Sequence, residues 1–187
     1  SNERWEELAR GLRKRLGRVE DEKKTFYEME LGELYESRLN DPVEARLFYE
    51  KVLEREPENA AALTALESIF RLLELWEPLI KVLRKNIELA EEPARARRMR
   101  RQIGDILAGP LESPKEAAVE YEKLIEDEPD DEDALRKLCD IYEELDLSKD
   151  YLRVAERLAD IVEDTEEQIA LYRRLIIELE MDPETKK

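Results

Sequence analysis

The chain has 187 residues, of which 42% are hydrophobic and 43% are charged, and its formal net charge is −17 at pH 7. With only 5 glycines and 8 prolines, helices with charged outer faces are favoured over long irregular loops. The acidic balance argues against binding to nucleic acid, which depends on Lys and Arg at the phosphates, and against docking on an anionic membrane surface. No apolar run is long enough for a transmembrane helix, and we expect no signal peptide. A single cysteine rules out an internal disulfide and predicts a reducing, cytoplasmic location.

Apolar residues recur at helical spacing along nearly the whole chain, and no segment alternates as a strand would. We interpret Ser1-Asn2 as the remnant of a cleaved tag and exclude it. Ten helices joined by short turns are expected. Those whose bounds the pattern defines are Arg4–Gly17, Lys23–Arg38, Ala60–Glu74, Trp76–Ala90, Asp131–Asp146, Lys149–Val162 and Thr165–Glu180.

Helix starts are marked by capping residues. Asp41 is an N-cap with Pro42 at the first helical position and Glu44 completing a capping box. The signature returns at Ser113-Pro114 with Glu116 and again at Asp182-Pro183, and Thr165 with Gln168 forms a further box. Because the Asp182-Pro183 signature comes just before Lys187, and the first helix has no partner before it, we expect both ends to be truncated.

An internal repeat of 72 residues organises the chain. Residues 31–57, LGELYESRLNDPVEARLFYEKVLEREP, return as residues 103–129, IGDILAGPLESPKEAAVEYEKLIEDEP. The residue pairs at this fixed offset are Gly32 and Gly104, Ala45 and Ala117, Tyr49 and Tyr121, and Pro57 and Pro129. Repetition at a fixed period predicts stacked structural units that bury their apolar faces on one another.

These matching positions resemble those of tetratricopeptide repeats, whose period is about 34 residues, so that two repeats fill the offset of 72. The resemblance covers residues 3–187. It implies one all-α domain, a right-handed solenoid of antiparallel helix pairs with about ten helices, which is a fragment of a longer bacterial-type array. It also implies a non-enzymatic scaffold that binds a partner protein or peptide through the concave surface formed by the first helix of each pair. The alternative is an oligomerisation or assembly module that self-associates through its open ends.

Candidate catalytic and metal-binding residues are few. The chain has no histidine, which removes the commonest general base and metal ligand. Cys139 could be a nucleophile, but without a histidine partner a buried structural thiol is the favoured interpretation. The acidic run from Glu126 to Asp133 lacks the spacing of a calcium loop and is expected to be a solvated turn. We therefore expect no enzyme activity, no metal and no cofactor.

One basic segment stands out in this acidic protein. Residues 93–102, PARARRMRRQ, hold five arginines and no acid. They could form salt bridges to Glu88, Glu91 and Glu92 or to the neighbouring helix, or they could contact a ligand. The resemblance turns a basic band toward the concave groove, made of Arg71, Arg98, Arg101, Arg136 and Lys137. Guanidinium groups bind carboxylates and phosphates through two parallel hydrogen bonds, so the expected partner is an acidic or phosphorylated peptide.

Overall fold

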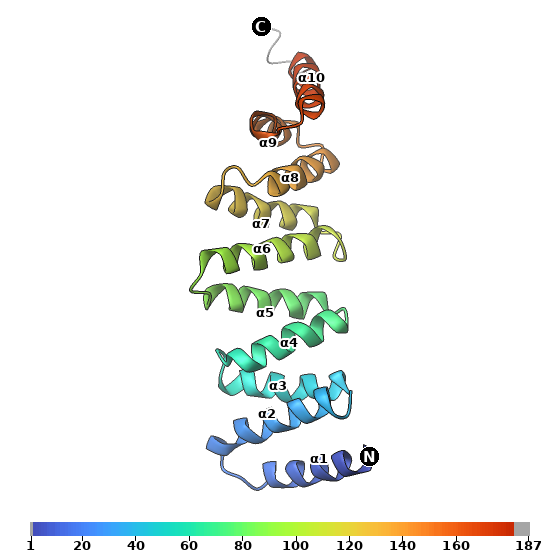
Figure 1. The fold of residues 1–187 in the computed structure, drawn as a ribbon, viewed down its shortest axis with the longest axis vertical. Helices are drawn as coiled ribbons and strands as arrows, with labels where there is room; N and C mark the ends of the chain where they lie inside the picture. The colour runs from blue at the N-terminus through green and yellow to red at the C-terminus, as the bar shows by residue number, and fades with distance from the viewer. Residues whose placement is uncertain (1, 182–187) are drawn as a thin grey trace. The chain divides into compact units, whose positions relative to one another are not determined.

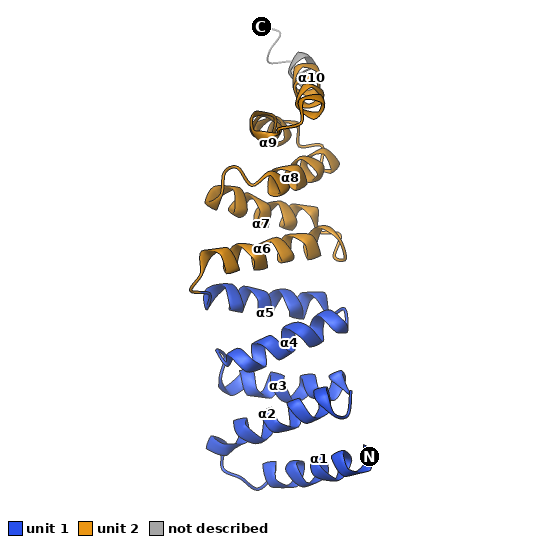
Figure 2. Ribbon diagram, viewed as in Figure 1, with its two compact units in different colours: residues 1–90 blue, residues 91–187 orange. Residues whose placement is uncertain are grey.

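The computed structural model describes residues 2–181, with side chains as far as residue 177 (Figure 1). Every element in this part of the chain is an α-helix, and ten are present, as predicted. The helices form two compact units, residues 1–90 and residues 91–187 (Figure 2). Each unit is a stack of helices, so the all-α fold of repeated helix pairs is confirmed, whereas a single domain over 3–187 stays a prediction.

Unit 1 contains the first five helices. Within the unit, α1 to α4 each pack against the helix that follows in the chain. Their bounds are α1 Asn2–Leu16, α2 Asp21–Ser37, α3 Pro42–Arg55, α4 Ala60–Leu72 and α5 Trp76–Glu88. The first and second helices of each pair alternate, so α2 and α4 are the first helices in this unit, and α1, α3 and α5 are second helices.

Unit 2 contains the other five helices, again packed in chain order. Their bounds are α6 Pro93–Ala108, α7 Pro114–Asp127, α8 Glu132–Glu144, α9 Ser148–Ile161 and α10 Thr165–Met181. Here α6, α8 and α10 are first helices, and α7 and α9 are second helices. The seven helices whose bounds were predicted from the apolar periodicity lie within a few residues of those bounds.

The predicted N-cap at Asp41 is confirmed, because its side chain accepts a hydrogen bond of 3.1 Å from the Glu44 N–H. Asn59 caps α4 and Asp131 caps α8 in the same way, through the Ala62 and Ala134 N–H groups. Each of these side chains satisfies one of the N–H groups that a helix start leaves without a partner inside the helix.

Two of the predicted capping interactions are wrong, although Ser113 does occupy the N-cap position of α7 before Pro114. The Ser113 hydroxyl donates to the Leu111 carbonyl at 3.0 Å and makes no hydrogen bond to the start of α7. At α10 the cap is Asp164, one residue before the predicted Thr165, and it accepts from the Glu167 N–H at 2.9 Å. A carboxylate accepts this bond more strongly than a hydroxyl, which explains why the acid takes the position. The third signature, Asp182-Pro183, lies outside the described residues.

The repeated glycines and tyrosines form the same contact in each unit. A Cβ added to Gly32 would lie 2.6 Å from Tyr49 Cε1, and a Cβ added to Gly104 would lie 2.9 Å from Tyr121 Cζ. Both tyrosine rings are fully buried. Glycine is therefore required because the ring of the second helix occupies the space of a side chain on the first helix, as the repeat predicts.

Candidate binding surface on the first helices

The five residues of the predicted basic band fall in both units. Arg71 lies on α4 in unit 1, where it is exposed and its Nη2 is 3.5 Å from Glu67 Oε1, four residues earlier on the same helix. The other four, Arg98, Arg101, Arg136 and Lys137, lie on α6 and α8 in unit 2. The candidate surface in unit 2 is built from these four alone.

Arg101 and Arg136 connect successive first helices. Arg101 of α6 is ion-paired with Asp131, the N-cap of α8. Arg136 of α8 donates to Glu132 at 2.6 Å and to Glu167 of α10 at 2.9 Å. These hydrogen bonds raise the pKa of Arg136, with Glu167 as the largest cause. Both cations already contact carboxylates of the protein, so they would have to exchange partners to bind a ligand.

Arg98 and Lys137 differ from these two. Both side chains are exposed. Neither makes an ion pair or a hydrogen bond with any residue that the structure describes. They are therefore the two cations of the predicted band in unit 2 that can bind a ligand without breaking an existing contact.

The arginine segment at the start of α6 is largely engaged in packing. Arg97 lies 3.3 Å from Glu128 and Arg100 lies 3.2 Å from Glu120, both measured from nitrogen to carboxylate oxygen. With the Arg101 pair, three of the five arginines contact the neighbouring α7 or the start of α8. The salt-bridge interpretation therefore holds for these three arginines. Their partners lie on the neighbouring helices and are not Glu88, Glu91 or Glu92.

Two equivalent ion pairs, each with a buried carboxylate, were missed by sequence reasoning. Glu28 of α2 is 2% exposed and pairs with Arg55 of α3. Its counterpart 72 residues later is Arg100, which pairs with the buried Glu120 of α7. The position therefore carries opposite charges in the two units, each matched by its second helix. The signal was available in the sequence as a charged residue at a site where Leu63 and Leu135 stand in the other copies.

The remaining candidates for chemistry have structural roles. Cys139 is 7% exposed, and burial raises the pKa of its thiol to about 12, so the reactive thiolate is scarce at neutral pH. No group of three or more potential metal ligands was found within residues 2–177. None of the described helices is long and apolar enough to cross a membrane.

The arrangement of these helices can be compared with known proteins. No family model and no curated protein matches the chain. Solved structures do match. A point mutant of MamA has a TM-score of 0.50 at 16% identity over 85% of this chain and 88% of that chain. A crystal structure of MamA has a TM-score of 0.48 at 20% identity, over 89% and 91% of the two chains.

A third structure is YrrB, described as a TPR protein with an unusual peptide-binding site, with a TM-score of 0.49 at 16% identity over 96% of this chain and 87% of that chain. At these identities the likeness shows the fold alone. The class defined by the fold is that of all-α proteins built from repeated antiparallel helix pairs. Within that class, the 72-residue period and the glycine–tyrosine contacts make this a tetratricopeptide-like repeat fold.

Proposed function

We propose that the protein is a non-enzymatic scaffold that binds a partner protein or peptide through the exposed faces of its first helices. The observation that carries this proposal is the contrast among the basic residues of α6 and α8. Arg101 and Arg136 are held by Asp131 and Glu167, whereas Arg98 and Lys137 are exposed and make no contact with the described residues. Exposed cations held on rigid helices suit recognition of an acidic or phosphorylated segment.

The net charge of −17 opposes such a ligand at long range. Screening limits that repulsion, since the Debye length is about 8 Å at physiological ionic strength. A contact with Arg98 or Lys137 is short enough to act within this distance. Binding is therefore expected to be modest, and its dependence on salt reflects two opposing terms, local attraction and overall repulsion.

The test uses a fluorescein-labelled peptide with four glutamates, the same peptide with one phosphoserine, and a glutamine version of matched length. Fluorescence anisotropy with the full chain should show binding of the two acidic peptides only. The variant Arg98→Glu with Lys137→Glu should weaken it at least about tenfold, which corresponds to about 1.4 kcal/mol.

A matched control removes the effect of net charge. Lys14→Glu with Lys81→Glu makes the same change in charge on α1 and α5, which are second helices of unit 1. This control should leave peptide binding within about twofold, because it changes the net charge equally without altering α6 or α8. Equal losses in the two double variants, or tight binding of the glutamine peptide, would mean that Arg98 and Lys137 are not the site.

Assembly through apolar helix faces is a second candidate function. On α1, Trp5 is 36% exposed and Leu8 is 46% exposed. On α10, Ile176 and Ile177 are each 56% exposed. Apolar faces of this kind favour association. Sedimentation velocity over a wide concentration range, with Leu8→Lys and Ile176→Lys as variants, tests this function, and a strict monomer at every concentration would rule it out.

A further inference from the structure

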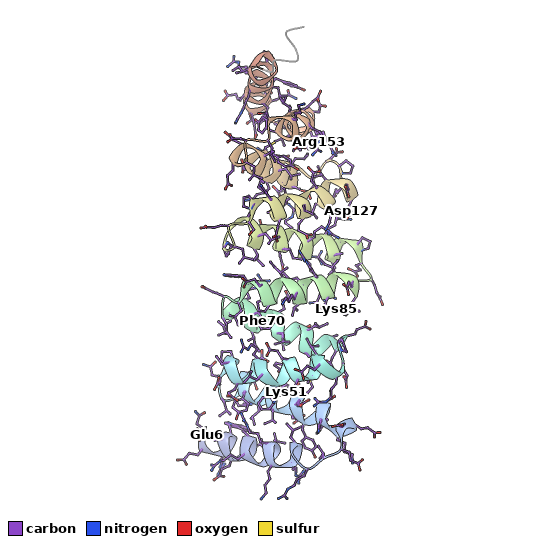
Figure 3. All side chains as sticks on the ribbon, turned by 180° about the vertical axis from the view of Figure 1, so that it is seen from behind. Glu6, Lys51, Phe70, Lys85, Asp127 and Arg153 are labelled. Carbon is purple, nitrogen blue, oxygen red and sulfur yellow. The ribbon has the colours of Figure 1, made fainter. Side chains whose placement is uncertain are left out.

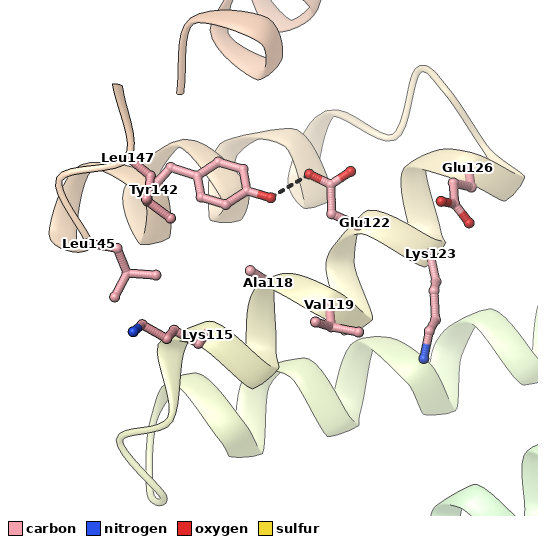
Figure 4. Close-up of a pocket in the computed structure, with 9 residues that line it drawn as sticks. All are labelled: Lys115, Ala118, Val119, Glu122, Lys123, Glu126, Tyr142, Leu145 and Leu147. Carbon is pink, nitrogen blue, oxygen red and sulfur yellow. Dashed lines mark hydrogen bonds between the residues drawn. The ribbon is translucent and has the colours of Figure 1, made fainter. Parts of the chain in front are cut away.

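Unit 2 has a groove of about 410 Å³ between α7 and the turn that connects α8 to α9 (Figure 4). This volume lies in the range of about 300–1,000 Å³ that is usual for ligand pockets. Its floor, which we call the α7 groove floor, consists of Ala118, Val119, Tyr142, Leu145 and Leu147. The groove is lined by α7 and by the C-terminal end of α8, and none of Arg98, Arg101, Arg136 and Lys137 lines it, so it is separate from the surface proposed above.

The α7 groove floor leaves apolar side chains in contact with solvent. Val119 is 53% exposed and Leu147 is 40% exposed. Figure 4 shows Val119 on α7 and Leu145 on the opposite side of the groove, with the Tyr142 ring above them. A ligand with apolar side chains would cover these surfaces and remove them from water, which favours binding.

Charged residues stand at the two ends of the groove. Lys115 and Glu126 line it and make no ion pair or hydrogen bond with any residue whose side chain the structure describes. They are eleven residues apart on α7, which is about 16 Å at 1.5 Å per residue. The groove therefore has a free cation at one end and a free carboxylate at the other.

The two charged residues between these ends are engaged. Glu122 accepts a hydrogen bond of 2.5 Å from the Tyr142 hydroxyl and is also paired with Arg153 of α9, which is labelled in Figure 3. Lys123 is 3.6 Å from Glu120 and extends away from Tyr142 in Figure 4. Lys115 and Glu126 are thus the charges that a ligand in the groove would meet.

The corresponding surface of unit 1 differs at four lining positions, and two of these change the size or charge of the side chain most. Arg46 stands where unit 2 has Ala118, and Val43 stands where unit 2 has Lys115. Arg46 is partly buried, with a side-chain exposure of 29%, and lies 3.6 Å from Glu50. A long side chain is thus tolerated at this repeat position, and the small Ala118 together with the charge of Lys115 is particular to unit 2.

We propose that the α7 groove binds an amphipathic helix of a partner protein. The apolar stripe of that helix lies on the floor, a carboxylate at one end pairs with Lys115, and a cation about three turns away pairs with Glu126. Helices bind apolar grooves through residues three or four positions apart, and a stripe of two or three turns matches the span between the two charges. Opposite charges at the ends fix the register of the bound helix.

The experiment uses a synthetic helix of about 16 residues with three leucines on one face, one glutamate and, about eleven residues away, one arginine. Its affinity for the full chain is measured by fluorescence anisotropy. Ala118→Arg fills the groove with the residue that unit 1 carries at this position, so it should fold normally, which circular dichroism verifies. It should weaken binding at least about tenfold.

Charge exchange then tests the orientation. Lys115→Glu should weaken binding of the same peptide by about three- to tenfold, and a peptide in which arginine replaces the glutamate should recover it. A peptide whose leucines are replaced by serine should not bind. Absence of binding by the wild-type chain, or unchanged binding by Ala118→Arg, overturns the proposal. If the Ala118→Arg variant sediments with a lower mass than the wild-type protein, the occupant of the groove is a second copy of this chain, and the proposal of a partner helix is wrong.

Discussion

The ring of Tyr121 lies against the backbone of Gly104, so that a Cβ at residue 104 would come within 2.9 Å of Tyr121 Cζ. Tyr121 is fully buried, and its hydroxyl donates a hydrogen bond of 2.7 Å to Asp105, which fixes the ring in place. The backbone of α6 at Gly104 is therefore separated from α7 only by the Tyr121 ring.

Gly104→Leu should accordingly destabilise the protein by about 1–3 kcal/mol, the usual cost of an overpacked core. Urea unfolding followed by circular dichroism measures the change. Gly11→Leu is the matched control, because Gly11 lies on a helix with no atom within 4 Å of its added Cβ. Similar unfolding midpoints for both variants would show that the Tyr121 contact does not restrict residue 104.

Arg55→Ala should destabilise unit 1, because it leaves the buried carboxylate of Glu28 without its partner. The expected loss is about 1–3 kcal/mol at neutral pH. Burial raises the pKa of Glu28, even with Arg55 beside it. The ionised form is therefore the one that burial opposes, and the loss should shrink as the pH falls through this raised pKa and Glu28 takes up a proton. Unfolding at several pH values measures the trend.

The control for this prediction removes both charges. Leucine stands at this position in the other copies, at Leu63 and Leu135. Glu28→Leu with Arg55→Ala should thus recover most of the stability lost in Arg55→Ala. A double variant that is no more stable than the single one would contradict the idea that the unpaired carboxylate causes the loss.

The thiol of Cys139 should react slowly with a disulfide reagent in the folded protein. Its side chain is buried, and its pKa is raised to about 12, so both access and thiolate formation are low at neutral pH. Labelling in buffer and in denaturant compares the two states. Fast labelling of the folded chain would show that α8 opens readily at this position.

Acid should loosen α10 before it unfolds the rest of unit 2. Arg136 lowers the pKa of Glu167, and Arg174 lowers the pKa of Glu143, in each case mainly through a hydrogen bond to the carboxylate. A lowered folded-state pKa gives stability that is present above the unfolded pKa and is lost as the pH falls through the folded one. As the pH is lowered, the hydrogen-exchange protection factors of α10 should fall before those of α7.

Much of this fold follows from the periodicity of the sequence. Gly32 and Tyr49 recur as Gly104 and Tyr121, and a repeated pair of this kind predicts both the helix pairing and the buried ring. Acidic caps such as Asp41 are also predictable, since a carboxylate has few better partners than the N–H groups at a helix start. The cap at Ser113 failed because a hydroxyl can donate as well as accept, and the Leu111 carbonyl competes for it.

The partners of the charged residues were much less predictable. Arg98 and Arg101 lie on one face of α6, and the sequence does not distinguish them. Only Arg101 forms an ion pair with Asp131, the N-cap of α8. With 49 acidic residues in the chain, many partners are available to each arginine, and small differences in side-chain reach decide among them. The α7 groove was missed because it depends on the absence of a side chain, at Ala118, rather than on a motif.

Because Arg101 is paired and Arg98 is not, replacing each should affect stability differently. Arg101→Glu with Arg136→Glu places carboxylates beside Asp131 and Glu167, so it should lower the stability of unit 2 by roughly 0.5–2 kcal/mol, since an exposed ion pair contributes up to about 1 kcal/mol. Arg98→Glu with Lys137→Glu breaks no contact among the described residues and should leave the unfolding midpoint unchanged. Thermal unfolding of both double variants, alongside the peptide-binding measurement, separates the two effects. A lowered midpoint in the second variant would mean that Arg98 or Lys137 stabilises the fold, and a loss of peptide binding in that variant would then no longer identify a ligand site.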